Sequence, residues 1–324
     1  MKKIYSLIIA ALVAMSIVGC NATEAAPTEP KKVQNVQIFS APNADSSVTV
    51  KSIEAGFDSV GLTIAGNNDM NKPFGLRFGK LHYKTYNLAM FSNSDLTLKL
   101  IKKYPNFGAL TPLTMSIWSD DEANTMNIAT LTVEGMSRAT NIPVTDPDLI
   151  AYAELIHKAF KAAMPKGALK ELNHTVKFPD QSLATNFKVE LELDGQDPVS
   201  YVEDFEAEFE AELEPLGFLL PNYSNLQEEI FDDAGYTGVY DFYHTYSICK
   251  FDVIYPVSKL HPEAGAWAPC SFYLYKKTGE NVMHLGFLSV ENWISTLDIE
   301  DEESIAPLRE AQGMIENIVK SITE

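Results

Sequence analysis

Two cysteines in the last third of the chain, Cys249 and Cys270, are the residues best suited to chemistry. Two thiols of this kind can form a disulfide, stay separate as buried thiols, or support metal or redox chemistry. The last role needs helpers, and His244, His261 or His284 could supply an imidazole. The sequence alone leaves these alternatives open.

Alternation along the expected strands bears on the disulfide. Cys270 has the same parity as Phe272 and Leu274, which predicts that it lies on the apolar face of its strand. Cys249 has the same parity as Ser247, which predicts that it lies on the face of its own strand opposite to the apolar face. Successive side chains of a strand point to opposite faces. This pattern disfavours a direct bond between the two sulfur atoms.

A second candidate for chemistry is the acidic segment Glu203–Glu214. It carries acids beside an apolar stripe at helical spacing, and it contains no base. Such a helix can dock a basic partner or bind Ca²⁺ loosely, or its acids can form a solvated face. No spacing in it matches a calcium-binding loop.

Motifs of the common enzyme classes are missing from the chain. It has no His-Glu-x-x-His, phosphate loop, Cys-x-x-Cys or Gly-x-Ser-x-Gly pattern. The segment Gly135–Ala139 lacks the final glycine of a nucleophile elbow, and we interpret it as a turn after a strand. The sequence therefore favours a protein without enzymatic activity, and it predicts no cofactor and no metal site.

The N-terminal residues form a pattern typical of a targeting signal. Lys2 and Lys3 precede the apolar run Ile4–Val18, and Cys20 follows directly after a glycine. This order resembles a bacterial lipoprotein signal, which implies a signal peptide over residues 1–19 and lipid on Cys20. Residues 20–34 are small, polar and proline-containing, which predicts a flexible tether.

The same resemblance implies a place in the cell. We expect a lipid-anchored protein of the cell envelope, in the outer membrane and facing the periplasm, because Asn21 follows the lipidated cysteine. The formal net charge of −19 becomes −21 once Lys2 and Lys3 are removed with the signal. This charge excludes nucleic acid as a partner. The remaining partners are the membrane, through the lipid, and a protein or small-molecule ligand of unknown identity.

The rest of the chain repeats itself. Pro105 and Pro262 are 157 residues apart, and Pro112 and Pro269 keep this offset. Between these prolines, the segments 107–112 and 264–269 are similar in composition. The offset predicts two homologous domains over residues 35–164 and 186–324, joined by a linker over residues 165–185.

Each half shows the same coarse order of elements. Strands come together between an early helix and a late helix, and the late helices span about Asp148–Met164 and Ser304–Ile322. Asp146 and Pro147 are typical of a helix start. The order predicts an α+β fold in which each domain is a mainly antiparallel sheet with helices packed on it.

One local pattern recurs in both halves: an apolar strand, a helical turn that ends in a proline, and a second proline seven residues later that opens another apolar strand. The segments are Tyr86–Phe91, Tyr104–Pro105, Pro112–Trp118, Tyr246–Cys249, His261–Pro262 and Pro269–Tyr275. The pattern resembles the bacterial family catalogued as domain of unknown function 302. The family has no established activity, so the resemblance implies a fold and supplies no mechanism.

The alignment of the two repeats assigns counterparts to the thiols. Matching Tyr246 with Tyr86 makes Ala89 the counterpart of Cys249, and it predicts an insertion before Tyr246. The offset of 157 makes Leu113 the counterpart of Cys270. The function that these observations favour is a membrane-anchored binding or interaction module. The alternative is a thiol-based redox or metal-binding protein that uses Cys249 and Cys270.

Overall fold

The computed structural model describes residues 34–172 and 176–323, which we call the first half and the second half. The predicted signal peptide, Cys20 and the tether before Gln34 lie outside the described residues. None of the helices in the described part is both long and apolar enough to cross a membrane.

The first half contains six strands, five α-helices and one 3-10 helix within its described residues. In chain order they are β1 (Val36–Pro42), α1 (Val50–Asp58), β2 (Thr63–Asp69), α2 (Asn71–Phe78), β3 (Tyr86–Ser92), α3 (Ser94–Lys103), η1 (Pro105–Leu110), β4 (Leu113–Asp120), β5 (Thr125–Leu131), α4 (Val133–Thr140), α5 (Pro147–Ala163) and β6 (Ala168–Lys170).

The second half contains five strands, four α-helices and three short helical turns within its described residues. They are β7 (Ala184–Glu190), α6 (Pro198–Leu213), η2 (Glu214–Leu216), β8 (Leu219–Asn225), η3 (Gln227–Phe231), β9 (Tyr240–Cys249), α7 (Phe251–Leu260), η4 (Pro262–Ala266), β10 (Cys270–Lys277), β11 (Val282–Leu288), α8 (Glu291–Thr296) and α9 (Glu302–Thr323).

The strands form two antiparallel sheets. Sheet A has the order β2-β3-β4-β5-β1-β6, and sheet B, read from its opposite edge, has the order β8-β9-β10-β11-β7. The first five positions of sheet A therefore match sheet B element for element. The predicted α+β class with antiparallel sheets is confirmed. The extra strand β6 lies in the segment that the sequence assigns to the linker, and it pairs with β1.

Strand register defines which residues of the halves correspond. Tyr86 pairs with Trp118, and Tyr243 pairs with Tyr275, while β4 and β10 keep the offset of 157. Tyr243 thus corresponds to Tyr86. The predicted match of Tyr246 with Tyr86 is wrong, because two tyrosines three residues apart both fit the apolar pattern. The insertion derived from it is reduced to one residue, since the offset between the halves is 156 at Asp69 and Asn225 and 157 at Tyr86 and Tyr243.

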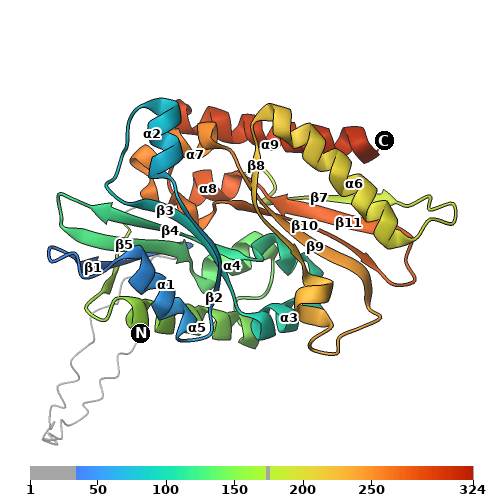
Figure 1. Ribbon diagram of the computed structural model, residues 1–324, viewed down its shortest axis with the longest axis horizontal. Coiled ribbons are helices and arrows are strands. Elements are labelled where there is room, and N and C mark those ends of the chain that lie inside the picture. Colours follow the sequence, from blue (N-terminus) through green and yellow to red (C-terminus); the bar gives the residue numbers. More distant parts are fainter. Residues whose placement is uncertain (1–33, 173–175, 324) are drawn as a thin grey trace, which may run out of the picture. The chain divides into compact units, whose positions relative to one another are not determined.

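Helices cover one face of each sheet. On sheet A, Phe57 of α1 packs edge-on against Phe91, with ring centroids 5.2 Å apart, and α5 runs beside α1. On sheet B, Phe209 of α6 stacks on Phe272 at 4.8 Å, and Figure 1 shows α6 and α9 side by side. The start of α5 is as predicted, because the Asp146 side chain accepts hydrogen bonds from the first-turn N–H groups after Pro147.

The other faces of the sheets hold the two halves together. The 3-10 helix η1 packs on sheet B, and η4 packs on sheet A. A Cβ atom on Gly108 would lie 2.7 Å from Tyr273 Cβ, and one on Gly265 would lie 2.5 Å from Ser116 Cβ. Only glycine allows this approach, since real Cβ atoms do not come so close. Each half therefore inserts a segment against the sheet of the other.

Hydrogen bonds repeat this reciprocal arrangement. The Tyr86 hydroxyl donates to the Pro262 carbonyl at 3.4 Å, and the Tyr243 hydroxyl donates to the Pro105 carbonyl. The peptide bonds before Pro112 and Pro269 are both cis. The two prolines occupy equivalent places, immediately before β4 and β10.

Candidate ligand-binding cleft between the halves

A cleft of about 460 Å³ lies where the end of β2 faces the start of β8. The first half contributes the end of β2, the start of α2 and one residue of β3. The second half contributes the start of β8, the end of β9, the start of α7 and the proline before β10. The lining residues are Asn67, Asn68, Asp69, Met70, Pro73, Leu88, Leu219, Leu220, Pro221, Cys249, Phe251 and Pro269.

The apolar part of the cleft comes from an irregular edge strand. The register of β8 against β9 shifts between Leu219 and Asn222, which leaves Leu220 and Pro221 outside the ladder. Proline has no N–H to donate, so it is tolerated at such a bulge on a sheet edge. Leu219 remains 41% exposed beside the cleft. An exposed leucine on a concave surface is a typical contact for an apolar ligand.

The polar part of the cleft is formed by Asn67, Asn68 and Asp69 at the end of β2. Asn67 is held in place: its amide donates to Glu54 Oε1 at 2.8 Å, and its carbonyl oxygen accepts from Asn87 Nδ2 at 2.9 Å. Asp69 Oδ1 accepts from the backbone N–H of Asn71 at 3.0 Å. Among the described lining residues, Asp69 carries the one charged side chain.

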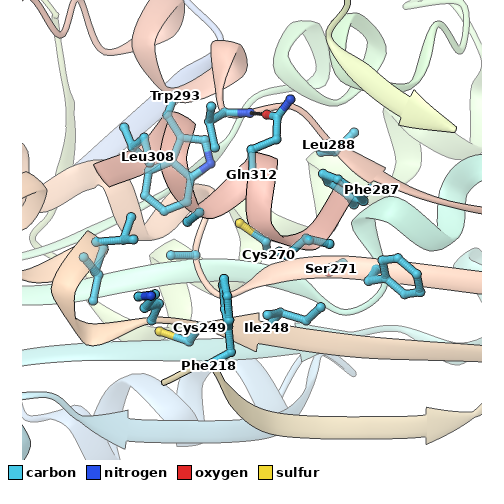
Figure 2. A pocket seen from close by; sticks show the side chains of 18 residues that line it. Phe218, Ile248, Cys249, Cys270, Ser271, Phe287, Leu288, Trp293, Leu308 and Gln312 are labelled. Carbon is cyan, nitrogen blue, oxygen red and sulfur yellow. Dashed lines mark hydrogen bonds between the residues drawn. The ribbon is translucent and has the colours of Figure 1, made fainter. Parts of the chain in front are cut away.

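A smaller apolar cavity of about 50 Å³ lies between sheet B and helices α7, α8 and α9 (Figure 2). Its lining includes Phe218, Phe272, Trp293, Leu308 and Ile315, and most of its walls are carbon. Figure 2 shows both thiols at this cavity, one from the end of β9 and one from the start of β10.

The two cysteines are free. Burial raises the pKa of each thiol from its ordinary 9.0 to about 12. Cys270 pairs in register with Ile248, the residue before Cys249, so the two thiols lie on opposite faces of neighbouring strands, as the parity argument predicts. A thiol with a raised pKa is largely protonated at neutral pH, which makes it a poor nucleophile.

Cys249 also lines the cleft, so its side chain stands between the cleft and the apolar cavity. By register it corresponds to Ser92 of the first half, and the predicted counterpart Ala89 is wrong. Cys270 corresponds to Leu113, as predicted.

The three candidate helper histidines do not join the thiols. His244 Nδ1 lies 2.8 Å from Glu206 Oε1, His261 lies 3.5 Å from a Glu263 oxygen, and His284 stacks on Tyr275. None of them lines the cleft or the cavity. Within residues 34–172 and 176–323, no group of three or more His, Cys, Asp and Glu side chains could hold a metal ion.

The acidic segment forms α6, and part of its acidic face is turned inward. Glu206 is buried against His244, whose Nδ1 also lies 3.2 Å from the Tyr223 hydroxyl. Glu210 accepts a hydrogen bond from the Tyr246 hydroxyl at 2.9 Å. The expected solvated face is therefore wrong for Glu206, whereas Glu210 is exposed and accepts its hydrogen bond at the helix surface. The spacing of the residues could have indicated the burial of Glu206, because this residue lies within the helical stripe of buried residues.

The segment Gly135–Ala139 lies within α4, so the turn expected there is wrong. The helix begins after Thr132, whose hydroxyl accepts from the Gly135 N–H at 3.0 Å. A Cβ atom on Gly135 would meet the backbone of Asn35, which explains the glycine. Ser137 donates to the Ile142 carbonyl and has a structural contact there.

Comparison with known proteins finds one family model that matches part of the chain. Residues 40–163 match the model of a family described as domain of unknown function DUF302. The predicted resemblance to this family is confirmed over these residues, which lie in the first half. None of the curated proteins matches the chain. A solved structure described as an uncharacterized conserved protein DUF302 from Bacillus stearothermophilus is similar, with 11% identity, a TM-score of 0.34, and coverage of 41% of this chain and 98% of that chain.

The DUF302 match covers β1 through α5 apart from the first strand residues, so it contributes the polar side of the cleft and one wall of the interface between the halves. The cleft can hold a small molecule by apolar contact at one side and by hydrogen bonds or charge at the other.

Proposed function

We propose that this protein is a membrane-anchored lipoprotein of the cell envelope that binds a small ligand in the cleft between its halves. The observation that carries the proposal is the cleft itself. Its volume of about 460 Å³ falls within the range of small-molecule sites. It lies at the junction of two sheet-and-helix units and combines apolar walls with few polar groups, which is the usual composition of a ligand site.

The anchoring part of the proposal rests on the N-terminal pattern that ends at Cys20. A lipid on this cysteine would hold the two-sheet body at the outer membrane, facing the periplasm. In a cell that expresses the protein, Cys20→Ala is expected to release it from the membrane fraction or to leave the precursor uncleaved. Unchanged mature size together with unchanged membrane retention would contradict the anchor.

The binding part of the proposal is tested with N-phenyl-1-naphthylamine, a neutral apolar fluorophore. The purified protein is expected to enhance its fluorescence with one site per chain. Leu220→Trp fills the cleft and is expected to abolish the enhancement. Leu169→Trp, at an exposed leucine of β6, is the matched control and leaves the enhancement unchanged. Enhancement that survives in the Leu220 variant would place the probe elsewhere and overturn the cleft as the site.

A duplicated origin of the two halves belongs to the same proposal. It is supported by the shared strand order, by the offset of 157 and by the reciprocal contacts of η1 and η4. The alternative function, thiol redox or metal chemistry at Cys249 and Cys270, is disfavoured because burial keeps both thiols protonated at neutral pH.

A further inference from the structure

Resting on the proposed function, we infer that the cleft selects a cationic amphiphile: a molecule with an aliphatic body and a protonated amine at one end. The amine would lie against Asp69, and the aliphatic body would lie along Leu219, Leu220 and Phe251.

The charge of the cleft sets the sign of the head group. Asp69 is exposed, and its Oδ1 is engaged by the Asn71 N–H, which leaves Oδ2 available to a ligand within the described part of the chain. The described lining contains no lysine, arginine or histidine. An anionic head group would meet a carboxylate without any compensating base, whereas an ammonium group would form a charge-assisted hydrogen bond. The side-chain carbonyl of Asn68, an exposed residue that pairs in register with Leu88 of the cleft, can accept a further hydrogen bond from an amine.

The apolar side chains of the cleft favour an aliphatic ligand body, and strand register shows which residues of the other half correspond to the cleft residues. Leu219 corresponds by register to Thr63, and Cys249 corresponds to Ser92. Similarly, Asp69 corresponds to Asn225, since they pair with the corresponding residues Asn87 and His244.

The cleft thus combines a carboxylate from the first half with apolar side chains from the second. The corresponding residues of the opposite halves, Asn225, Thr63 and Ser92, are all polar and uncharged. The chemistry that suits an amphiphile is therefore specific to this pairing and does not follow from the shared fold.

The test compares three eight-carbon probes that differ in their head groups: octylammonium, octanol and octanoate. Each displaces N-phenyl-1-naphthylamine from the full mature chain at low ionic strength and neutral pH. We expect octylammonium to bind about threefold more tightly than octanol, the size expected for an exposed ion pair. Octanoate is expected to bind more weakly than octanol.

Two variants separate the cleft from the general negative charge of the protein. Asp69→Asn is expected to reduce octylammonium affinity to that of octanol, with octanol binding unchanged. Asp58→Asn, at an exposed aspartate of α1 outside the cleft, removes the same charge as the matched control and is expected to leave all three affinities unchanged.

The outcomes distinguish the two proposals. If none of the probes displaces the fluorophore, or displacement is the same in Leu220→Trp, the proposed function fails. If octanol binds in the cleft but octanoate binds as tightly as octylammonium, or Asp69→Asn changes nothing, the cleft stands and the cationic selectivity is overturned.

Discussion

The same place in the two sheets, beneath α1 and beneath α6, carries different polar chemistry. In the first half, Asn87 and Asn67 form a chain of neutral amides that ends at Glu54. In the second half, register places His244 where the first half has Asn87, and Tyr223 where it has Asn67. His244 meets the buried Glu206 of α6, and the Tyr223 hydroxyl lies 3.2 Å from His244 Nδ1. One fold therefore tolerates either a neutral amide chain or a buried titratable cluster at one position.

Apolar packing differs between the halves as well. The buried residues of α5 and α9 follow the same spacing with an offset of 155, which matches Ile156 with Ala311 and Phe160 with Ile315. Ala311 and Ile315, which line the apolar cavity, are smaller than these counterparts, whereas Leu308 is larger than its counterpart Ala153. The first half shows that the same scaffold can be packed with larger side chains, so the cavity is a property of the second half.

The largest expected effect comes from the two polar clusters. His244→Ala removes the donor that faces the buried Glu206 carboxylate, and we expect a loss of about 3 kcal/mol in the free energy of unfolding. Asn87→Ala, at the corresponding position, is expected to cost about 1 kcal/mol because its partners are neutral amides. Urea unfolding followed by circular dichroism measures both. Equal losses would show that the clusters are energetically alike.

The next effect tests whether the halves depend on each other. Gly265→Ala pushes a methyl group against Ser116 and Leu88 of sheet A, and we expect a loss of about 2 kcal/mol. Gly108→Ala should cost a similar amount against sheet B. Gly313→Ala, inside α9 with open space around it, is the control and is expected to gain about 0.5–1 kcal/mol from helix propensity. If either interface glycine behaves like Gly313, the reciprocal packing is not tight in solution.

A smaller effect tests the cavity. Ala311→Val adds carbon to the cavity wall, and we expect a gain of about 1 kcal/mol. Ala159→Val, at a fully buried alanine of α5, is the matched change in the tightly packed half and is expected to lose about 1–3 kcal/mol. Thermal unfolding of both variants gives the comparison. A loss in both would mean that the cavity closes in solution.

The smallest effect concerns pH. Folding raises the thiol pKa to about 12, so the stabilisation is complete below the ordinary value of 9.0 and is lost as pH rises toward 12. At about pH 9.5 one thiol should cost about 0.8 kcal/mol of stability relative to neutral pH. Cys270→Ala is expected to show an alkaline loss that is smaller by this amount. An unchanged pH dependence would mean that water reaches the thiol in the folded protein.

Much of the fold could be predicted from the sequence. Apolar runs such as Leu113–Trp118 predict the central strands, and the spacing of Leu149, Ile156 and Phe160 predicts α5. The edge strands β2 and β8 could not be predicted, because bulges and polar side chains interrupt their alternation.

The cleft could not be predicted for a different reason. Asp69 and Leu219 are far apart in the sequence, and nothing local to either segment indicates that the two edge strands meet. The glycines at 108 and 265 were visible as repeat positions, yet a repeat does not say that each segment packs on the sheet of the other half. Motif reasoning instead favoured Cys249 and Cys270, because thiols are the groups whose chemistry can be read without a structure.

The mutual insertion of η1 and η4 has a consequence for stoichiometry. Two identical chains that exchanged such segments across a twofold axis would have to present every interface site twice, with the same residues at both copies. Joining the sheets within one polypeptide removes that obligation. Asp69 can then face Leu219 at one end of the junction while Asn225 and Thr63 hold the corresponding places at the other. A single chain of this kind can therefore have one ligand site per molecule, while the rest of the junction serves to pack the two halves together.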